Sequence, residues 1–575
     1  MSDVASEVAR QSLAVVFAGS GASGAMTAGA VFLRAGAHAG YYGLMTQLFG
    51  AQVRGGESAA LVQIATEPVE TPPDRYDVFV ALDWEKLDQF ASEIPLDEAS
   101  VIVADPQAGV ASPNIARSKA RTVALAMSEG VKHGRGAKRV NMFAVGAICG
   151  LVGLSTGDLE VAVAKVFAGR DEDMVHANRV GAVAGFAASS GLPLNLRMGP
   201  PRRNGHWLIS GNQAIALGAL RGGVRFVGCY PITPATDLVE WLAPHLIKLG
   251  GRLVLGEDEL ASVNMAIGAS YGGTPSMTVT SGPGFSLMIE ALGLATAAEI
   301  PLVLIDVMRA GPSTGIASKT EQSDVNLAIY GAHGDAPRIV MAPMSVADCA
   351  GTGEYAAYVA EALQTPVIVL SDQQIGQSTA VIDPDHPRPK PLTRRVDGVA
   401  PDKPFKRYAL DGDPLTPMPI PGTPGHEWVA EGLTHNEAGL PASGAGPHVA
   451  QINKRAKKIA RFDAGDWWGQ CWGDSATAIV AFGSTIGPAR EAARRLAAAG
   501  RPVRVVGLRV LAPLPAEQLA RALNGVRRII VVEQNHGAQL YHYLLGRKAI
   551  PPAAESVARP GPLPYRPSEI ASYVA

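Results

Sequence analysis

The sequence has few cysteines, and they are scattered. The four are Cys149, Cys229, Cys349 and Cys471, and no two of them form a Cys-x-x-Cys pair. Iron–sulfur clusters usually need four thiolates, commonly in a closely spaced run. Isolated cysteines are more typical of small buried side chains. The pattern predicts that this chain itself holds no cluster and no metal.

Long apolar runs and an excess of one charge are also missing. No apolar run reaches the roughly 18 residues that a membrane-spanning helix needs. The net charge of −2 gives no electrostatic case for a nucleic-acid or anionic-membrane partner. Residues Met1–Glu7 lack the basic region of a signal peptide. We therefore expect a cytoplasmic protein without a membrane or nucleic-acid partner.

The composition is that of a large globular enzyme. Hydrophobic residues make up 47% and charged residues 18% of 575 positions, enough for three or four domains with buried cores. Strand and helix signals alternate, which predicts an α/β fold of several doubly wound parallel-sheet domains. The expected divisions are 1–195, 196–374, a proline-rich excursion at 375–475, and 476–575.

A glycine-rich turn opens the first domain. Ser12–Gly19 reads as a strand, Gly19–Gly24 is a G-x-G-x-x-G, and a small-residue helix follows from about residue 25. A dinucleotide site would have an acidic residue about 20 positions further on, but positions 40–53 carry none. We interpret the turn as structural, with anion binding as the alternative. Arg197–Asn204 is the expected linker to the next domain.

The second domain is expected to have a parallel sheet with polar groups at one edge. Its expected strands are 224–229, 252–255, 276–280, 301–307 and 366–371, with helices between them and Asn212 as the N-cap of the first helix. Thr233, Glu259, Ser281–Gly284 and Arg309 each follow the end of a strand. Because ligands bind at the carboxyl ends of parallel strands, these groups predict a site.

The remaining chain divides into an irregular and a regular part. Prolines crowd positions 384–424, so we expect extended backbone without regular structure from about Gln374 to Trp472. Its histidines lack zinc-motif spacing. Residues 476–575 read as a third α/β unit, in which Glu533–Asn535 is interpreted as a simple strand-to-helix turn, with a partner contact as the alternative.

Several motifs in the second domain occur in a specific order. They are Tyr-Pro-Ile-Thr-Pro at 230–234, Glu-Asp-Glu at 257–259, Thr-Ser-Gly-Pro-Gly at 280–284, Met-Arg-Ala-Gly-Pro-Ser-Thr-Gly at 308–315 and Lys-Thr-Glu-Gln-Ser-Asp at 319–324. The chain thereby resembles the alpha subunit of 2-oxoacid:ferredoxin oxidoreductases of the 2-oxoglutarate type, with a gamma domain fused at the N-terminus. Arg54–Ser58 matches a further motif of the gamma domain.

The resemblance implies thiamine diphosphate as cofactor. It also implies that the second domain is of the pyrimidine-binding type and that the last is like the C-terminal domain of transketolase. The cofactor works as a C2 carbanion and electron sink. Its activation needs a carboxyl next to the pyrimidine N1′, and the resemblance assigns that role to Glu259. The other residues implied to bind the cofactor are Tyr230, Pro231, Ile232, Ser281 and Gly282.

One half of a thiamine site is missing from the sequence. The diphosphate and Mg²⁺ are normally held by a Gly-Asp-Gly motif, and this chain has none. Together with the scattered cysteines, this absence implies a beta subunit that carries Mg²⁺, the diphosphate half-site and a [4Fe-4S] cluster. The resemblance further implies a dimer of alpha–beta heterodimers that passes electrons to ferredoxin.

The resemblance also implies a substrate pocket. Arg309 would bind the oxoacid carboxylate or help to place coenzyme A, the co-substrate, and Thr233 would donate a hydroxyl to the oxoacid. The implied pocket continues through Ser313, Thr314, Ser318, Lys319 and Thr320. Relatives have Pro-Thr where this chain has Ala317-Ser318, so the residue for a distal carboxylate stays open.

The implied reaction interconverts 2-oxoglutarate and coenzyme A with succinyl-CoA and CO₂. The alternatives are a pyruvate, branched-chain or indolepyruvate enzyme, a non-catalytic scaffold subunit, and a nicotinamide-linked dehydrogenase that uses Gly19–Gly24. The motifs at 311–315 and 319–323 favour 2-oxoglutarate. The presence of Thr233, Glu259 and Arg309 argues against a scaffold, and the missing acidic residue argues against a dehydrogenase.

Overall fold

The computed structural model describes residues 9–50, 56–85, 87–89, 91–130, 139–201, 206–384, 386–396 and 404–574. The chain forms two compact units. The first contains Met1–Ile209, Gln377–Asp385 and Arg566–Ser568, and the second contains the rest. Arg54, in the motif at 54–58, and residues 202–204 of the expected linker lie outside the described residues.

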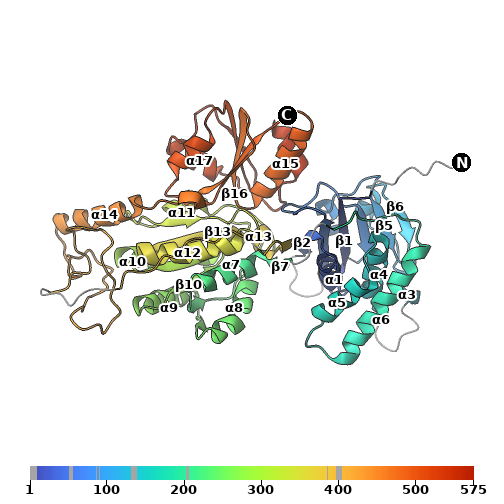
Figure 1. Cartoon of the computed structure of the whole chain (residues 1–575), viewed down its shortest axis with the longest axis horizontal. Coiled ribbons are helices and arrows are strands. Elements are labelled where there is room, and N and C mark those ends of the chain that lie inside the picture. The colour runs from blue at the N-terminus through green and yellow to red at the C-terminus, as the bar shows by residue number, and fades with distance from the viewer. Residues whose placement is uncertain are drawn as a thin grey trace. The chain divides into compact units, whose positions relative to one another are not determined.

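The first unit is built on one sheet of eight strands in the order β6-β5-β4-β1-β3-β2-β14-β7 (Figure 1). The strands are β1 Ser12–Ser20, β2 Tyr42–Phe49, β3 Glu57–Ala65, β4 Val78–Ala81, β5 Val101–Ala104, β6 Arg121–Ala124, β7 Trp207–Ser210 and β14 Thr379–Ile382. The longer helices are α1 Ala25–His38, α4 Val140–Val152, α5 Thr156–Val166 and α6 Glu172–Ala188, and the short ones are α2 Pro113–Ala116 and α3 Met127–Gly130. Apolar side chains of α1, α4 and α5 pack on the sheet in one buried core.

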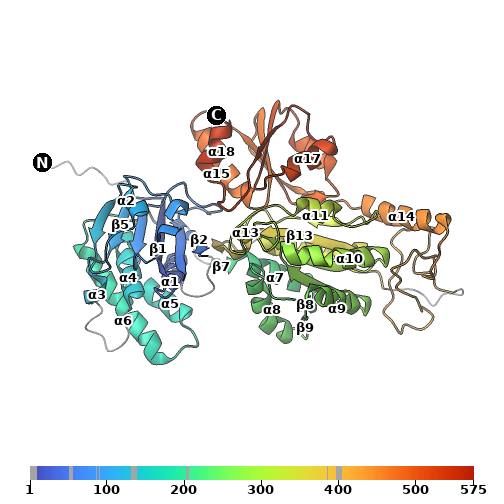
Figure 2. The same ribbon diagram turned by 180° about the vertical axis from the view of Figure 1, so that it is seen from behind.

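The second unit has a central sheet of seven strands in the order β18-β12-β13-β11-β10-β8-β9 (Figure 2). Its strands are β8 Phe226–Cys229, β9 Arg252–Leu255, β10 Ser276–Thr280, β11 Leu302–Met308, β12 Ile339–Met341, β13 Pro366–Asp372 and β18 Val510–Ala512. All neighbouring pairs are parallel except β12 with β18. The helices are α7 Gly211–Arg221, α8 Thr236–Lys248, α9 Glu259–Tyr271, α10 Gly282–Ala297, α11 Val325–Tyr330, α12 Cys349–Leu363 and α13 Gln373–Gln377.

The predicted α/β fold is confirmed, although β3 is antiparallel to β1 and β2 in the first unit. The cap of α7 differs from the prediction. Ser210 rather than Asn212 is the N-cap, because Ser210 and Gln213 form a reciprocal capping box. The side chain of Asn212 instead donates to the carbonyl oxygen of Pro234 at 2.9 Å and to Asp237 Oδ1 at 2.6 Å. Asn212 therefore stabilises the turn that follows β8.

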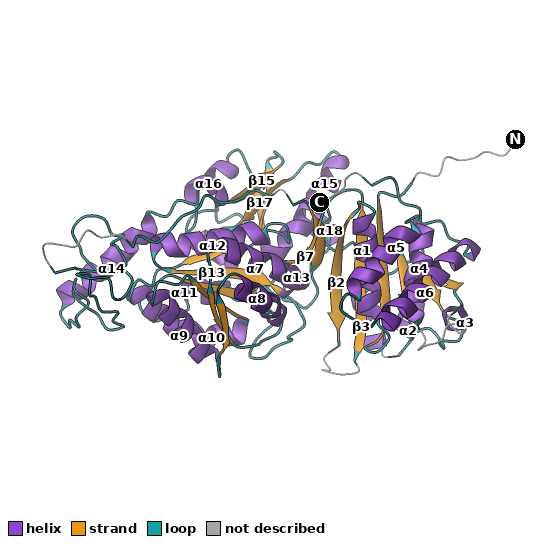
Figure 3. Ribbon diagram, turned by 60° about the horizontal axis from the view of Figure 1, so that its bottom comes forward, coloured by secondary structure: helices purple, strands orange, loops and turns teal. Residues whose placement is uncertain are grey.

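The C-terminal part contains a second, smaller sheet in the order β15-β17-β16-β19-β20. Its strands are β15 Gly469–Trp472, β16 Thr477–Phe482, β17 Arg504–Leu508, β19 Arg528–Glu533 and β20 Glu555–Ala558. The helices are α15 Ile486–Ala498, α16 Ala516–Ala522, α17 Gln539–Gly546 and α18 Pro567–Val574. Figure 3 shows α15, α16 and α18 in purple, and Figure 1 shows α17. Buried side chains of this sheet and of the central sheet belong to one continuous core.

The proline-rich stretch is irregular only in its middle. The prediction of extended backbone from Gln374 to Trp472 is wrong at both ends, where α13, β14, α14 Ala445–Ala460 and β15 lie. The crowded prolines fall between residues 384 and 424, where the described residues form neither helix nor strand. Proline removes the backbone donor that both structures need.

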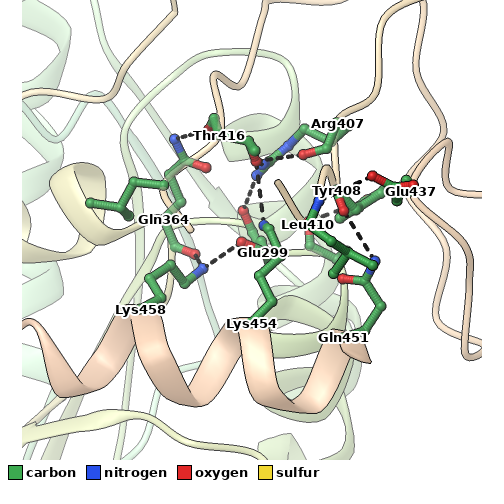
Figure 4. Close-up of polar contacts among 12 residues, drawn as sticks. Glu299, Gln364, Arg407, Tyr408, Leu410, Thr416, Glu437, Gln451, Lys454 and Lys458 are labelled. Atoms are coloured by element: carbon green, nitrogen blue, oxygen red, sulfur yellow. Dashed lines mark hydrogen bonds and ion pairs between the residues drawn. The ribbon is translucent and has the colours of Figure 1, made fainter. Parts of the chain in front are cut away.

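A buried ion cluster connects this stretch to Glu299, which lies between α10 and β11 of the central sheet (Figure 4). Glu299, fully buried, accepts from Lys454 Nζ at 2.6 Å and from Lys458 Nζ at 2.8 Å, both on α14. Arg407 Nη2 donates to the backbone oxygen of Glu299 at 2.8 Å and its Nη1 donates to Thr416. Buried charged side chains therefore hold in place both the irregular segment that contains Arg407 and Thr416 and the helix α14.

Candidate active site

The first part of the site is the turn after β8. Tyr230, Pro231 and Thr233 are exposed, and Ile232 is half-buried. The Thr233–Pro234 peptide bond is cis. The turn stands at the carboxyl end of the parallel sheet, where α/β proteins bind ligands.

Arg309 joins this turn to the loop after β11. The residue is 8% exposed, and its Nη1 donates to the carbonyl oxygen of Thr233 at 2.5 Å while its Nη2 donates to that of Thr314 at 2.9 Å. Burial lowers the pKa of Arg309 below its usual value, against the opposing pull of Asp306 and Asp324. Two of its five N–H groups are used in these bonds, so the guanidinium retains donors for an anion.

Glu259 is the buried carboxyl of the site. It is the first residue of α9, follows the N-cap Asp258, and is 7% exposed, whereas Glu257 is exposed. A Cβ atom on Gly284 would lie 2.5 Å from Glu259 Oε1, so glycine at this position is what allows the carboxyl to pack on the turn after β10. A buried carboxyl at the open edge of a sheet fits the proton-exchanging group that a thiamine pyrimidine requires.

The turn after β10 contains two of the predicted cofactor-binding residues, Ser281 and Gly282. Ser281 is fully buried and its hydroxyl has no hydrogen-bond partner among the described residues. Gly282 begins α10 and is half-buried. An unpaired buried hydroxyl at the carboxyl end of a strand is a donor that a bound ligand could use.

The loop after β11 closes on itself. Ala310 N donates to the carbonyl oxygen of Lys319 at 3.0 Å, and Ile316 N donates to that of Ala310 at 2.9 Å. Ser313 and Thr314 are exposed, and Ser318 and Lys319 are half-buried. Thr320 differs from the other predicted pocket residues, because it is 1% exposed and its hydroxyl accepts from Gln374 N.

The C-terminal sheet holds the end of this loop. Gln322 is fully buried, and its Nε2 donates to the carbonyl oxygen of Phe482 at 2.9 Å. Gln534 N donates to Gln322 Oε1 at 3.0 Å, and Asn535 Nδ2 donates to Gln322 O at 3.0 Å. The turn at 533–535 is therefore more than a strand-to-helix connection. No local pattern in the sequence indicates this pairing, because it joins residues more than 200 positions apart.

Glu533 stabilises the same turn from within. It is fully buried, and its carboxylate accepts from Leu540 N at 2.8 Å, Tyr541 N at 2.9 Å and Asn535 Nδ2 at 2.6 Å. These bonds fix Asn535 in the orientation in which it also reaches Gln322. Glu533 thus stabilises the contact between the turn at 533–535 and Gln322.

The described ranges contain neither a metal-binding group of side chains nor a helix that could cross a membrane. No three or more His, Cys, Asp or Glu side chains there are grouped so that they could hold a metal ion. Cys149, Cys229 and Cys349 are buried and Cys471 is exposed, all as free thiols. Across the same ranges, no helix has both the length and the apolar character needed to cross a membrane.

Three family models match successive parts of the chain. Pyruvate ferredoxin/flavodoxin oxidoreductase matches residues 14–188, the thiamine-diphosphate-binding domain of pyruvate flavodoxin/ferredoxin oxidoreductase matches 217–454, and pyruvate:ferredoxin oxidoreductase core domain II matches 475–545. The chain belongs to the 2-oxoacid:ferredoxin oxidoreductase family.

Within this family the chain is similar to the KorA subunits. It is 32% identical to 2-oxoglutarate oxidoreductase subunit KorA of Mycobacterium tuberculosis over 566 residues, which cover 90% of this chain and 83% of that protein. It is 36% identical to 2-oxoglutarate synthase subunit KorA of Archaeoglobus fulgidus over 331 residues, covering 57% of this chain and 88% of that protein.

A solved structure matches almost the whole chain. It is the 2-oxoglutarate:ferredoxin oxidoreductase from Magnetococcus marinus with 2-oxoglutarate, coenzyme A and succinyl-CoA bound. The TM-score is 0.88 at 34% identity, over 98% of this chain and 99% of that chain.

Proposed function

We propose that this chain is the alpha subunit of a 2-oxoglutarate:ferredoxin oxidoreductase. The complex interconverts 2-oxoglutarate and coenzyme A with succinyl-CoA and CO₂, and exchanges electrons with ferredoxin. The observation that carries the proposal is the likeness over nearly the full chain to an enzyme with those ligands bound. The gathering of Thr233 and Arg309 at one sheet edge supports it.

Thiamine diphosphate, when bound, supplies the carbanion that attacks the oxoacid and accepts its electrons. Glu259 would be the group that exchanges a proton with the pyrimidine of the bound cofactor, since it is a buried carboxyl at the carboxyl end of a strand. The residues that shape the pyrimidine half of the site are Tyr230, Pro231, Ile232, Ser281 and Gly282.

Substrate recognition is assigned to Arg309 and to the loop after β11. The remaining donors of Arg309 bind the carboxylate common to all 2-oxoacids, and Thr233 donates its hydroxyl to the same substrate. Lys319 is the proposed partner of the distal carboxylate, assisted by hydroxyls of Thr314 and Ser318. The burial of Thr320 assigns it to the support of the loop.

A beta subunit completes the site. Five large apolar side chains are exposed around the sheet edge, at 41% to 58% of their maximum: Tyr230, Leu255, Leu260, Leu287 and Ile316. Apolar groups gathered next to a ligand edge are typical of a covered interface. The beta subunit would supply Mg²⁺, the diphosphate half-site and a [4Fe-4S] cluster. Two alpha–beta heterodimers would form the complex that exchanges electrons with ferredoxin.

The proposal is tested by purifying the chain alone and together with its proposed beta subunit. The isolated chain should be colourless, hold no iron and leave oxoacids unchanged. The complex should reduce ferredoxin with 2-oxoglutarate and coenzyme A, and with pyruvate at a lower kcat/KM. Stoichiometric iron and sulfide in the isolated chain, or a preference for pyruvate in the complex, would refute it.

A further inference from the structure

Asp306 is a charged side chain in an otherwise apolar strand. It lies on β11, is fully buried, and pairs in register with Thr280 at the end of β10. Neither of its carboxyl oxygens accepts a hydrogen bond from an N–H or hydroxyl group of the described residues. An isolated buried carboxylate is costly, so such a group must be protonated or find a proton donor.

The group that meets Asp306 is another carboxyl. The side chains of Asp306 and Asp324, the N-cap residue of α11, are hydrogen bonded to each other. Asp324 Oδ2 is buried, and a Cβ atom on Gly282 would lie 3.0 Å from it. Asp324 therefore contacts the start of α10 at Gly282, and Glu259 contacts the same segment two residues further on, at Gly284.

Two carboxyl groups in hydrogen-bond contact cannot both be ionised at low cost. Burial and then the charge of Asp324 raise the pKa of Asp306 well above its usual value. Burial also raises the pKa of Asp324, to about 6. The other charged groups acting on the pair are Arg309, at the end of the same strand, and Glu321, in the loop before Asp324.

Arg309 senses the charge of this pair without being bonded to it. Both aspartates raise its pKa, yet its hydrogen bonds go to the carbonyl oxygens of Thr233 and Thr314. A pair that shares one proton has a single negative charge, and this charge favours the protonated guanidinium. Two would compete with an incoming carboxylate for the same cation.

We propose that Asp306 and Asp324 share one proton and thereby act as a positioning pair that keeps Arg309 available to the substrate carboxylate. The inference rests on the proposed role of Arg309 in binding the oxoacid. The shared proton itself does not depend on that role. When the pair loses its proton, the affinity for the oxoacid falls.

The first experiment detects the proton. In the assembled complex, the infrared spectrum should contain the carbonyl band of a buried, protonated carboxylic acid, and the band should disappear in Asp306→Asn. Asp324→Asn tests the same point if the first variant does not assemble. A band that is absent from the wild type, or that survives in both variants, overturns the inference even if the complex is fully active on 2-oxoglutarate.

The second experiment detects the coupling to Arg309. KM for 2-oxoglutarate should rise about tenfold between neutral and alkaline pH in the wild type, because a charged hydrogen bond to Arg309 weakens. Asp306→Asn leaves a single carboxylate at every pH, so it should remove this rise. Asp335→Asn, which removes an exposed acid after α11, is the control and should keep the rise. A rise that persists in Asp306→Asn overturns the coupling, whereas Arg309→Ala with normal KM would overturn the proposed role of Arg309 instead.

Discussion

Arg309 Nη1 donates to the carbonyl oxygen of Thr233, which lies 76 residues earlier in the chain. The bond connects the turn after β8 with the loop after β11, and the second bond, to Thr314, fixes that loop as well. A single buried cation thus organises both segments that were expected to meet the substrate. A substitution of Arg309 therefore removes two things at once: the bonds that hold the two segments together and the cation that binds an anion.

Replacing Arg309 by alanine should lower kcat/KM for every 2-oxoacid alike, by at least tenfold to a hundredfold. Arg309→Lys should recover little of this loss, because one ammonium cannot reproduce the planar arrangement of donors. The measurement is kcat/KM for 2-oxoglutarate and 2-oxobutyrate in the reassembled complex. A selective loss for only one of the two substrates would contradict a role at the shared carboxylate.

Lys319→Ala should affect 2-oxoglutarate more than 2-oxobutyrate, since only the former has a distal carboxylate. Loss of a charged hydrogen bond costs about 1.5–3 kcal/mol, or roughly tenfold to a hundredfold in kcat/KM. Lys406→Ala is a suitable control because its ammonium pairs with Glu437 in the proline-rich stretch. An unchanged preference between the two substrates would assign distal recognition to the beta subunit.

Glu259→Gln should leave the fold intact and slow proton exchange at C2 of bound thiamine diphosphate by about 10²–10⁴. The change is nearly isosteric, so the packing against Gly284 is retained. Exchange is followed by NMR in the assembled complex, with Glu257→Gln as the control because Glu257 is exposed. Exchange at the wild-type rate would exclude Glu259 from this role.

Asn535→Ala should make the loop after β11 less stable, although Asn535 itself lies outside that loop. The change removes the bonds to the Gln322 carbonyl and to Glu533. We expect faster hydrogen exchange in residues 310–324 and a higher KM for the oxoacid. Gln518→Ala, which removes an exposed bond to Asp463, provides the comparison. Equal exchange in both variants would show that the loop needs no support from this turn.

Glu299→Gln should destabilise the second unit by about 3–5 kcal/mol, because it leaves two buried ammonium groups without their counterion. Asp413→Asn breaks an exposed pair with Arg461, beside the same helix, and should cost about 0–1 kcal/mol. Denaturant unfolding of the two variants compares these values. A loss for Glu299→Gln no larger than that for Asp413→Asn would mean that the cluster contributes nothing net.

The same cluster has a pH signature. Burial alone would raise the pKa of Glu299, but Lys458, Lys454 and Arg407 together hold it below its usual value. The stabilisation from a carboxyl with a lowered pKa is complete above its unfolded-state pKa and is lost as the pH falls. Acid should therefore destabilise the wild type, and this part of the pH dependence should be absent from Glu299→Gln.

The elements with strong local patterns could be predicted from the sequence. The strands β10, β11 and β13 and the order of the motifs at their ends follow from apolar runs bounded by glycine and proline. The pairing of Gln322 with Gln534 and the carboxyl contact of Asp306 depend on which distant segments meet, and composition does not encode that. Asp306 did leave one trace, as the single acid in the apolar run Leu302–Met308.

The position of β18 limits where this chain could be divided. The strand belongs by sequence to the C-terminal part, yet it forms the edge of the central sheet by pairing with β12. A gene split or a chimera made near residue 475 would uncover the edge of β12 and the apolar surface shared by both sheets. Hybrid subunits assembled from relatives should therefore keep residues 476–575 from the same parent as the central sheet.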